Sequence, residues 1–201
     1  MKPLLLTALL MTSLATHAQP SFTGPREDDR ALPEHFLQFI SDKNHNVGLP
    51  HLDSTTVLPN TVELRVYTDF KAHGQGGHAA VLQRLVWQNG ELHEAINYPA
   101  CATRGVSSKA DLVPLAEALG DAQLFDIPDE RALLLRRGLY SRPEVVYVVQ
   151  VASEHSERSF FVTDPQKHTR MPALQRFVQA QKAIDLRLGS PVENCFALSQ
   201  N

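Results

Sequence analysis

The sequence predicts an α+β protein, built as a small antiparallel sheet of about five strands with two or three helices packed on one face. Segments that alternate apolar and polar residues, or are rich in β-branched residues, indicate the strands. An Asn-Gly pair between two extended segments indicates a tight hairpin. Apolar residues at helical spacing, each group followed by a glycine, indicate the helices that cover the sheet.

The first 18 residues have the layout of a secretory signal peptide. Lys2 supplies a positive charge, residues 4–14 are dominated by leucine, and residues 16–18 (Thr-His-Ala) place small side chains before a cleavage point at Gln19. A buried helix or a membrane anchor is the alternative, but a membrane span needs about 20 apolar residues. We therefore expect a soluble chain that is exported to the periplasm or secreted, with no lipid anchor.

Residues 19–60 have the composition of a flexible arm in front of the folded domain. The segment contains several prolines and the charged run 26–30. Apolar residues within 34–41 are compatible with a short helix, whereas 42–61 shows little periodicity and is expected to be mostly loop. The compact α+β domain is predicted over residues 61–201.

The first three predicted strands cover residues 62–70, 79–88 and 91–98. The first alternates apolar and polar side chains, which is typical of a strand with one buried face. The other two flank the Asn-Gly pair at 89–90, which suits a type I′ turn because both central positions need a positive φ. They are accordingly expected to form a hairpin.

The register that a two-residue turn predicts for this hairpin matches apolar residues at some positions and mismatches them at another. A two-residue loop would place Trp87 opposite Leu92, as two apolar neighbours on one face. The same register would place Val81 opposite Tyr98, but it would also set apolar Leu85 opposite Glu94.

Residues 111–120 are predicted to form the first helix of the domain. A proline inside a helix costs about 3 kcal/mol, so Pro114 is expected in the first turn. That position favours Asp111 over Ser107 or Ser108 as the N-cap residue. The buried stripe would comprise Leu112, Leu115, Ala116 and Leu119.

The remaining elements follow in order toward the C-terminus. Residues 129–137 indicate a short helix, and the β-branched run 144–152 is typical of a central strand buried on both faces. Residues 158–163 are the expected hairpin partner of that strand, and 171–188 form a closing helix that Gly189 ends. The apolar face of the closing helix would comprise Leu174, Phe177, Val178, Ile184 and Leu188.

Export determines how the two cysteines, Cys101 and Cys195, are interpreted. In an oxidising compartment two such cysteines are expected to form a disulfide. The bond would close a loop of about 95 residues, which the chain-entropy model associates with about 4–5 kcal/mol of stabilisation. A catalytic thiol is the alternative, but neither cysteine lies in a recognisable nucleophile motif.

Composition and motifs exclude several functions. The chain of 201 residues carries 19 Lys+Arg against 22 Asp+Glu, so it has no basic excess with which to bind nucleic acid. The glycine-rich segment 74–77 lacks the Lys-Ser/Thr ending of a phosphate loop, and a strand rather than a helix follows it. We expect no nucleotide or other cofactor.

The histidines offer a weak metal-binding hypothesis. His73 and His78 flank the glycine-rich segment, with Asp69 upstream. A zinc site needs three or four ligands, and no pair has the spacing of a helical His-Glu-x-x-His motif. Scattered loop histidines are more often solvated, so His73 and His78 are candidates without a recognised third ligand.

Signatures of catalysis are missing from the sequence. It has no Gly-x-Ser-x-Gly elbow, and the Ser-Ser-Lys run at 107–109 does not have Ser-x-x-Lys spacing. The Glu-His-Ser run at 154–156 resembles a triad in letters only, because adjacent residues at a hairpin tip do not form a triad. No catalytic residue is assigned, which favours a non-enzymatic role without deciding it.

A family resemblance covers residues 62–188. Its motifs are a strand, a Gly-Gly pair at 76–77 and a second strand, then the run 124–128 (Leu-Phe-Asp-Ile-Pro), and later 147–151, 161–164 and the closing helix from Pro172. In these features the chain resembles small α/β proteins of the emfourin-like type. Emfourin inhibits a metalloprotease by binding it, so the resemblance implies a non-catalytic protein-binding role. The signal peptide, the arm and the cysteine pair depart from that pattern, and no binding residue is carried over.

The leading interpretation is an exported, disulfide-bonded α+β domain that binds another exported protein, for example as an inhibitor. Exposed strand edges at 62–70 and at the hairpin around 89–90 are the expected contact surfaces, because an open edge can pair with an extended segment. A periplasmic metal-binding protein that uses loop histidines is the alternative. An enzyme whose site is not recognisable in the sequence is the third interpretation.

Overall fold

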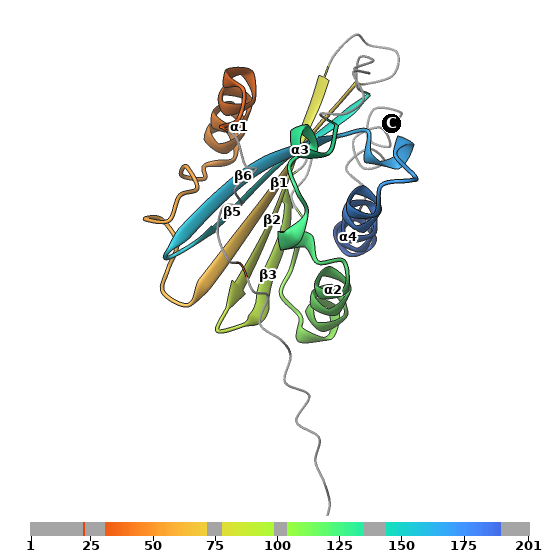
Figure 1. The fold of residues 1–201 in the computed structure, drawn as a ribbon. Coiled ribbons are helices and arrows are strands. Elements are labelled where there is room, and N and C mark those ends of the chain that lie inside the picture. The colour runs from red at the N-terminus through yellow and green to blue at the C-terminus, as the bar shows by residue number, and fades with distance from the viewer. Residues whose placement is uncertain (1–21, 23–30, 72–77, 99–103, 135–143, 190–201) are drawn as a thin grey trace, which may run out of the picture.

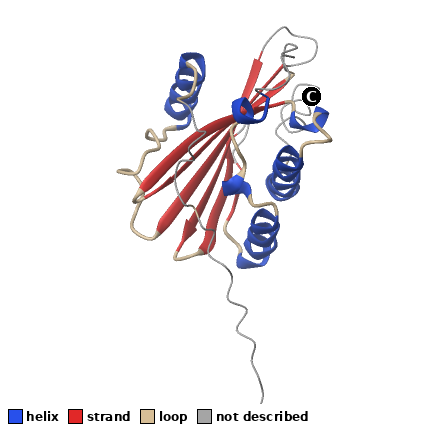
Figure 2. Cartoon of the chain, viewed as in Figure 1, coloured by secondary structure: helices blue, strands red, loops and turns tan. Residues whose placement is uncertain are grey.

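The computed structural model describes residues 22, 31–71, 78–98, 104–134 and 144–189. Within these residues the chain forms one six-stranded antiparallel sheet and four α-helices, which confirms the predicted α+β class with one strand more than expected (Figures 1 and 2). No helix in the described part is long and apolar enough to cross a membrane. The predicted signal peptide lies outside the described residues.

The six strands follow the spatial order β4-β3-β2-β1-β5-β6. Their bounds are β1 Thr61–Lys71, β2 His78–Gln88, β3 Glu91–Tyr98, β4 Arg104–Val106, β5 Val145–Ser153 and β6 Ser156–Thr163. The prediction that residues 62–70 form an open edge is wrong, because β1 pairs with β2 on one side and with β5 on the other. Val66, for example, lies opposite both Gln83 and Val149.

The helices cover both faces of the sheet (Figure 1). They are α1 Glu34–Val47, α2 Lys109–Asp121, α3 Glu130–Leu134 and α4 Pro172–Leu188, with short 3₁₀ turns η1 Leu124–Asp126 and η2 Pro165–Lys167. On one face α2 and α4 enclose the main core, which includes Leu64, Phe160 and Phe177. On the other face α1 encloses a second core around Ile40 and Tyr67.

Helix α1 extends six residues beyond the short helix that the apolar pattern indicated, to Val47. Its second half contains buried polar side chains. Lys43 is buried, and its ammonium donates to the carbonyl of Ala80 at 2.9 Å. The neighbouring Asn44 is buried as well. Gly48 then ends the helix with a φ of 73°, a conformation that suits glycine. Helical periodicity was invisible in the sequence because polar residues occupy part of the buried face.

Helix α2 begins earlier than predicted, and Asp111 is not its N-cap residue. The N-cap is Ser108, whose carbonyl accepts hydrogen bonds from the backbone N–H groups of Asp111 and Leu112 at 2.9 and 3.0 Å. Pro114 therefore lies inside the helix and leaves the carbonyl of Ala110 without its helical donor. Ala110 is exposed, so water can satisfy that carbonyl. The predicted buried residues Leu112, Leu115 and Leu119 are confirmed.

The β2–β3 hairpin has the predicted turn but a different register. Asn89 and Gly90 have φ values of 51° and 84°, as a type I′ turn requires, and Trp87 lies opposite Leu92. The register then shifts at a bulge, which sets Leu85 opposite Ala95 instead of Glu94. Tyr98 correspondingly lies opposite Leu82, not Val81. The shift brings two fully buried apolar residues together and removes the predicted mismatch.

The C-terminal elements agree closely with the sequence pattern. Strand β5 lies between β1 and β6, and five successive residues of it, from Val148 to Ala152, are buried. Helix α4 buries four of its five predicted apolar residues, while Val178 is half-buried. Gly189 ends α4 with a φ of 84°. Helix α3 is described as far as Leu134, and the rest of the predicted helix over 129–137 lies outside the described residues.

Candidate functional site

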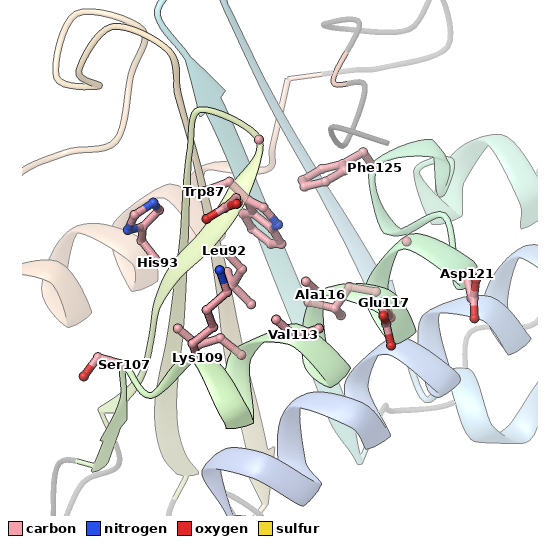
Figure 3. A pocket seen from close by; sticks show the side chains of 15 residues that line it. Trp87, Leu92, His93, Ser107, Lys109, Val113, Ala116, Glu117, Asp121 and Phe125 are labelled. Atoms are coloured by element: carbon pink, nitrogen blue, oxygen red, sulfur yellow. The ribbon is translucent and has the colours of Figure 1, made fainter. Parts of the chain in front are cut away.

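A groove of about 600 Å³ opens between the end of the β2–β3 hairpin and α2 (Figure 3). Its inner wall comes from the hairpin, its outer wall from α2, and one end from the η1 turn. Pockets of this size commonly bind ligands when apolar walls carry a few polar groups at the rim. The lining comprises Trp87, Gly90, Glu91, Leu92, His93, Ser107, Lys109, Leu112, Val113, Ala116, Glu117, Leu119, Gly120, Asp121 and Phe125.

The floor of the groove is a packed aromatic pair. Trp87 is 3% exposed, and Phe125 contacts it edge-on with ring centroids 5.4 Å apart and an interplanar angle of 71°. Leu92 is the cross-strand neighbour of Trp87, and Val113 and Ala116 face them from α2 (Figure 3). Trp87 and Leu92 belong to the main core, and Phe125 and Ala116 pack against it, so the groove exists before any ligand arrives.

Local sequence features place these residues. The type I′ turn and the bulge put Trp87 and Leu92 on the face that α2 covers, while His93 points away from Trp87 (Figure 3). Gln123 adopts a φ of 50°, which turns the chain from the end of α2 into η1 and carries Phe125 to the groove. Arg158 then fixes the backbone there by donating to the carbonyl of Phe125 at 3.0 Å.

The rim of the groove is predominantly acidic. Glu91 lies at the hairpin, and Glu117 and Asp121 lie along α2; Lys109 supplies the one ammonium among the described lining residues. All four side chains belong to exposed residues. An apolar floor with an acidic rim can bind a large apolar side chain whose neighbours are basic.

The strand that borders the groove keeps part of its outer edge open. On the side of β3 away from β2, β4 pairs with Ala95, Ile96 and Asn97, and no described strand pairs there with the stretch from Glu91 to Glu94. Backbone groups without a described strand partner therefore lie next to the apolar floor. Among the described residues, the hairpin around residues 89–90, one of the two predicted contact surfaces, thus has an edge to which no strand is added.

Ser107 and His93 of the lining do not form a nucleophile–base pair. Figure 3 shows them apart, and no hydrogen bond joins them. At the β5–β6 turn, His155 contacts Glu154 at 3.1 Å, and its side chain is 84% exposed. Ser156 there engages the Ser153 hydroxyl, so these groups stabilise a turn.

The predicted metal ligands are only partly described. His78 is the first residue of β2 and lies opposite Lys71, while His73 lies outside the described residues. Across the described ranges, no group of three or more His, Cys, Asp or Glu side chains could hold a metal ion. Cys101 and Cys195 also lie outside the described residues.

Sequence reasoning missed a buried polar network beneath α1. Arg65 is 2% exposed, and its guanidinium donates to Glu63 at 2.7 Å and to Asn44 at 3.2 Å. Tyr67 donates from its hydroxyl to Asn44 at 2.9 Å and lies 3.0 Å from the Gln150 amide oxygen. The alternating pattern of β1 suggested that these polar residues face water. Because α1 covers them, the network stabilises the fold and is not open to a ligand.

Comparison with known proteins identifies no family for this chain. No family model matches the sequence, and no curated protein is significantly similar to it. The emfourin-like resemblance therefore stays a prediction from sequence pattern.

Proposed function

We propose that the protein is an exported, non-catalytic binding domain whose groove beside Trp87 takes a large apolar side chain from an extended segment of a partner protein. The single observation that carries the proposal is the preformed apolar groove bordered by the open edge of β3. An extended segment can pair with that edge while one of its side chains enters the groove. Burying one large apolar side chain contributes about 1.5–3 kcal/mol.

The acidic rim specifies the chemistry of the partner. Glu91, Glu117 and Asp121 outnumber Lys109 around the opening, so basic residues on either side of the inserted side chain are favoured. Inhibition of an exported enzyme is one form that such binding would take. A metal-binding protein that uses His73 and His78 remains the alternative proposal.

Peptide binding tests the proposal directly. Trp87 is the only tryptophan in the chain, so its fluorescence reports on the groove. We expect a ten-residue peptide with one phenylalanine between lysines to change that fluorescence, and to bind about tenfold more tightly than a twin with glutamates in place of the lysines. Ala116→Trp, which fills the groove, should abolish binding, as followed by polarisation of a labelled peptide.

The matched control is Ala110→Trp, the same substitution on an exposed position of α2 that does not line the groove. It should leave peptide affinity unchanged, and both variants should melt cooperatively. Equal binding of the two peptides, or full binding by Ala116→Trp, would contradict the proposal. Turnover of a small substrate without peptide binding would favour an enzyme.

Export and the disulfide belong to the same proposal. Protein recovered from the exported fraction should begin at Gln19, and its intact mass should lack two hydrogens relative to the reduced chain. Non-reducing peptide mapping should find Cys101 linked to Cys195. Met1 at the N-terminus of exported protein would refute the cleavage, and two freely alkylated thiols would refute the bond.

A further inference from the structure

A third aromatic side chain contacts the floor of the groove. Phe22 lies against Phe125, with ring centroids 6.2 Å apart and an interplanar angle of 51°. Phe125 in turn contacts Trp87, so its ring has two aromatic neighbours. Phe22 is half-buried against the main core but is not part of the groove lining. It therefore supports the floor of the groove without occupying the space inside.

Hydrogen bonds hold the backbone around Phe125, whereas packing holds its side chain. Arg158 holds the carbonyls of Phe125 and Ile127 at 3.0 and 2.7 Å, which fixes the path of the chain. The ring itself is only half-buried. Its position at the groove therefore depends on the aromatic neighbours on its two sides.

The described chain resumes after Phe22 at two residues that are held against the fold. Ala31 accepts a hydrogen bond from Arg131 through its carbonyl at 2.9 Å, and Leu32 is buried in the second core beneath α1. Ala31 lies nine positions after Phe22 in the sequence.

We propose that Phe22 is a positioning residue of the groove, which holds Phe125 edge-on to Trp87 and thereby sets the affinity for an inserted apolar side chain. The affinity part of this inference rests on the proposed function, whereas the effect on Trp87 does not. Phe22 then belongs to the binding site through its contact with Phe125. Cleavage before Gln19 would leave Phe22 as the fourth residue of the mature chain.

The test compares the full mature chain with Phe22→Ala and Phe22→Tyr. Without the Phe22 ring, Phe125 moves more freely and Trp87 becomes more accessible, so acrylamide quenching of Trp87 should rise at least twofold. Affinity for the lysine-flanked phenylalanine peptide should fall roughly three- to tenfold, in line with the loss of one aromatic pair. Phe22→Tyr keeps the ring and should restore both values.

Leu37→Ala is the matched control, because it truncates an exposed apolar residue of the N-terminal part, far from the groove lining. It should change neither quenching nor affinity. Unchanged quenching in Phe22→Ala would overturn the positioning role, even if the melting temperature falls. If the unsubstituted protein does not bind the peptide, the proposed function fails, while the quenching comparison still decides the role of Phe22. Should Phe22→Ala not fold, Phe22→Leu, which keeps apolar volume but no ring, is judged by the same quenching criterion.

Discussion

Replacing Phe160 with alanine is expected to lower the free energy of unfolding by about 3–5 kcal/mol. Phe160 is fully buried in β6, within the main core. The substitution removes its buried apolar surface and leaves a cavity. It also removes the ring over which the Arg158 guanidinium lies, 4.6 Å from the centroid. Urea denaturation followed by circular dichroism measures the effect.

Leu186→Ala provides the matched control on the surface. Leu186 is 80% exposed on α4, so its truncation should change stability by no more than about 0.5 kcal/mol. A Phe160→Ala protein as stable as Leu186→Ala would mean that the main core is not packed as described.

Replacing Glu63 with glutamine is expected to cost about 3–5 kcal/mol, as is typical when one partner of a buried ion pair is removed. The carboxylate of Glu63 accepts hydrogen bonds from Arg65 at 2.7 Å and from Arg84 at 2.8 Å. Arg65 is buried beneath α1, so without the carboxylate its charge stays uncompensated. Denaturant unfolding at neutral pH measures the loss.

Glu94→Gln is the matched comparison, because Glu94 contacts the same Arg84 at 3.1 Å from a side chain that is 37% exposed. This exposed pair should contribute about 1 kcal/mol or less. Similar losses in the two variants would indicate that Glu63 is hydrated rather than buried.

The Glu63 ion pairs also predict how the free energy of unfolding depends on pH. Burial favours the neutral carboxyl, but the hydrogen bonds and charges of Arg84 and Arg65 outweigh it and lower the pKa of Glu63. With a lower pKa in the folded state, the unfolded state binds the proton more readily, so this stabilisation is present at neutral pH. It is lost as the pH falls below about 4.5, the ordinary value for this carboxyl. Glu63→Gln should flatten the acid side of the stability curve.

Local patterns predicted the elements well because each pattern reports on its own segment. The Asn-Gly pair identified the β2–β3 turn, and the β-branched run identified β5 as a strand paired on both sides. The position of β1 was not predictable in the same way. The alternating pattern of β1 does not reveal its second partner, β5, which lies far along the chain.

Other errors arose where tertiary contacts outweigh local preference. Lys43 and Asn44 interrupt the apolar stripe of α1, but hydrogen bonds to the sheet allow them to be buried. Pro114 suggested a later start for α2, although the exposed turn around Ala110 tolerates the missing hydrogen bond. In both helices the boundary was wrong and the element itself was right.

The groove was less predictable than the fold. Trp87 was expected to pair with Leu92 on one face of the hairpin, but its aromatic partner Phe125 lies far along the chain in a three-residue turn. In the sequence, the run that contains Phe125 carries the family resemblance and no other signal. No periodicity marks a turn residue as part of the floor of a groove, because its contact with Trp87 depends on the whole path from α2 through η1.

The central place of β1 has a consequence for how the chain folds. β1 to β4 form a meander from neighbours in sequence, and β5 and β6 form their own hairpin. The two units meet where Val66 lies opposite Val149, so this contact closes the longest loop in the sheet. Non-local pairing of this kind slows folding. Until β5 is synthesised and docks, one whole side of β1 presents unpaired backbone groups, and the unfinished chain is then most prone to aggregate.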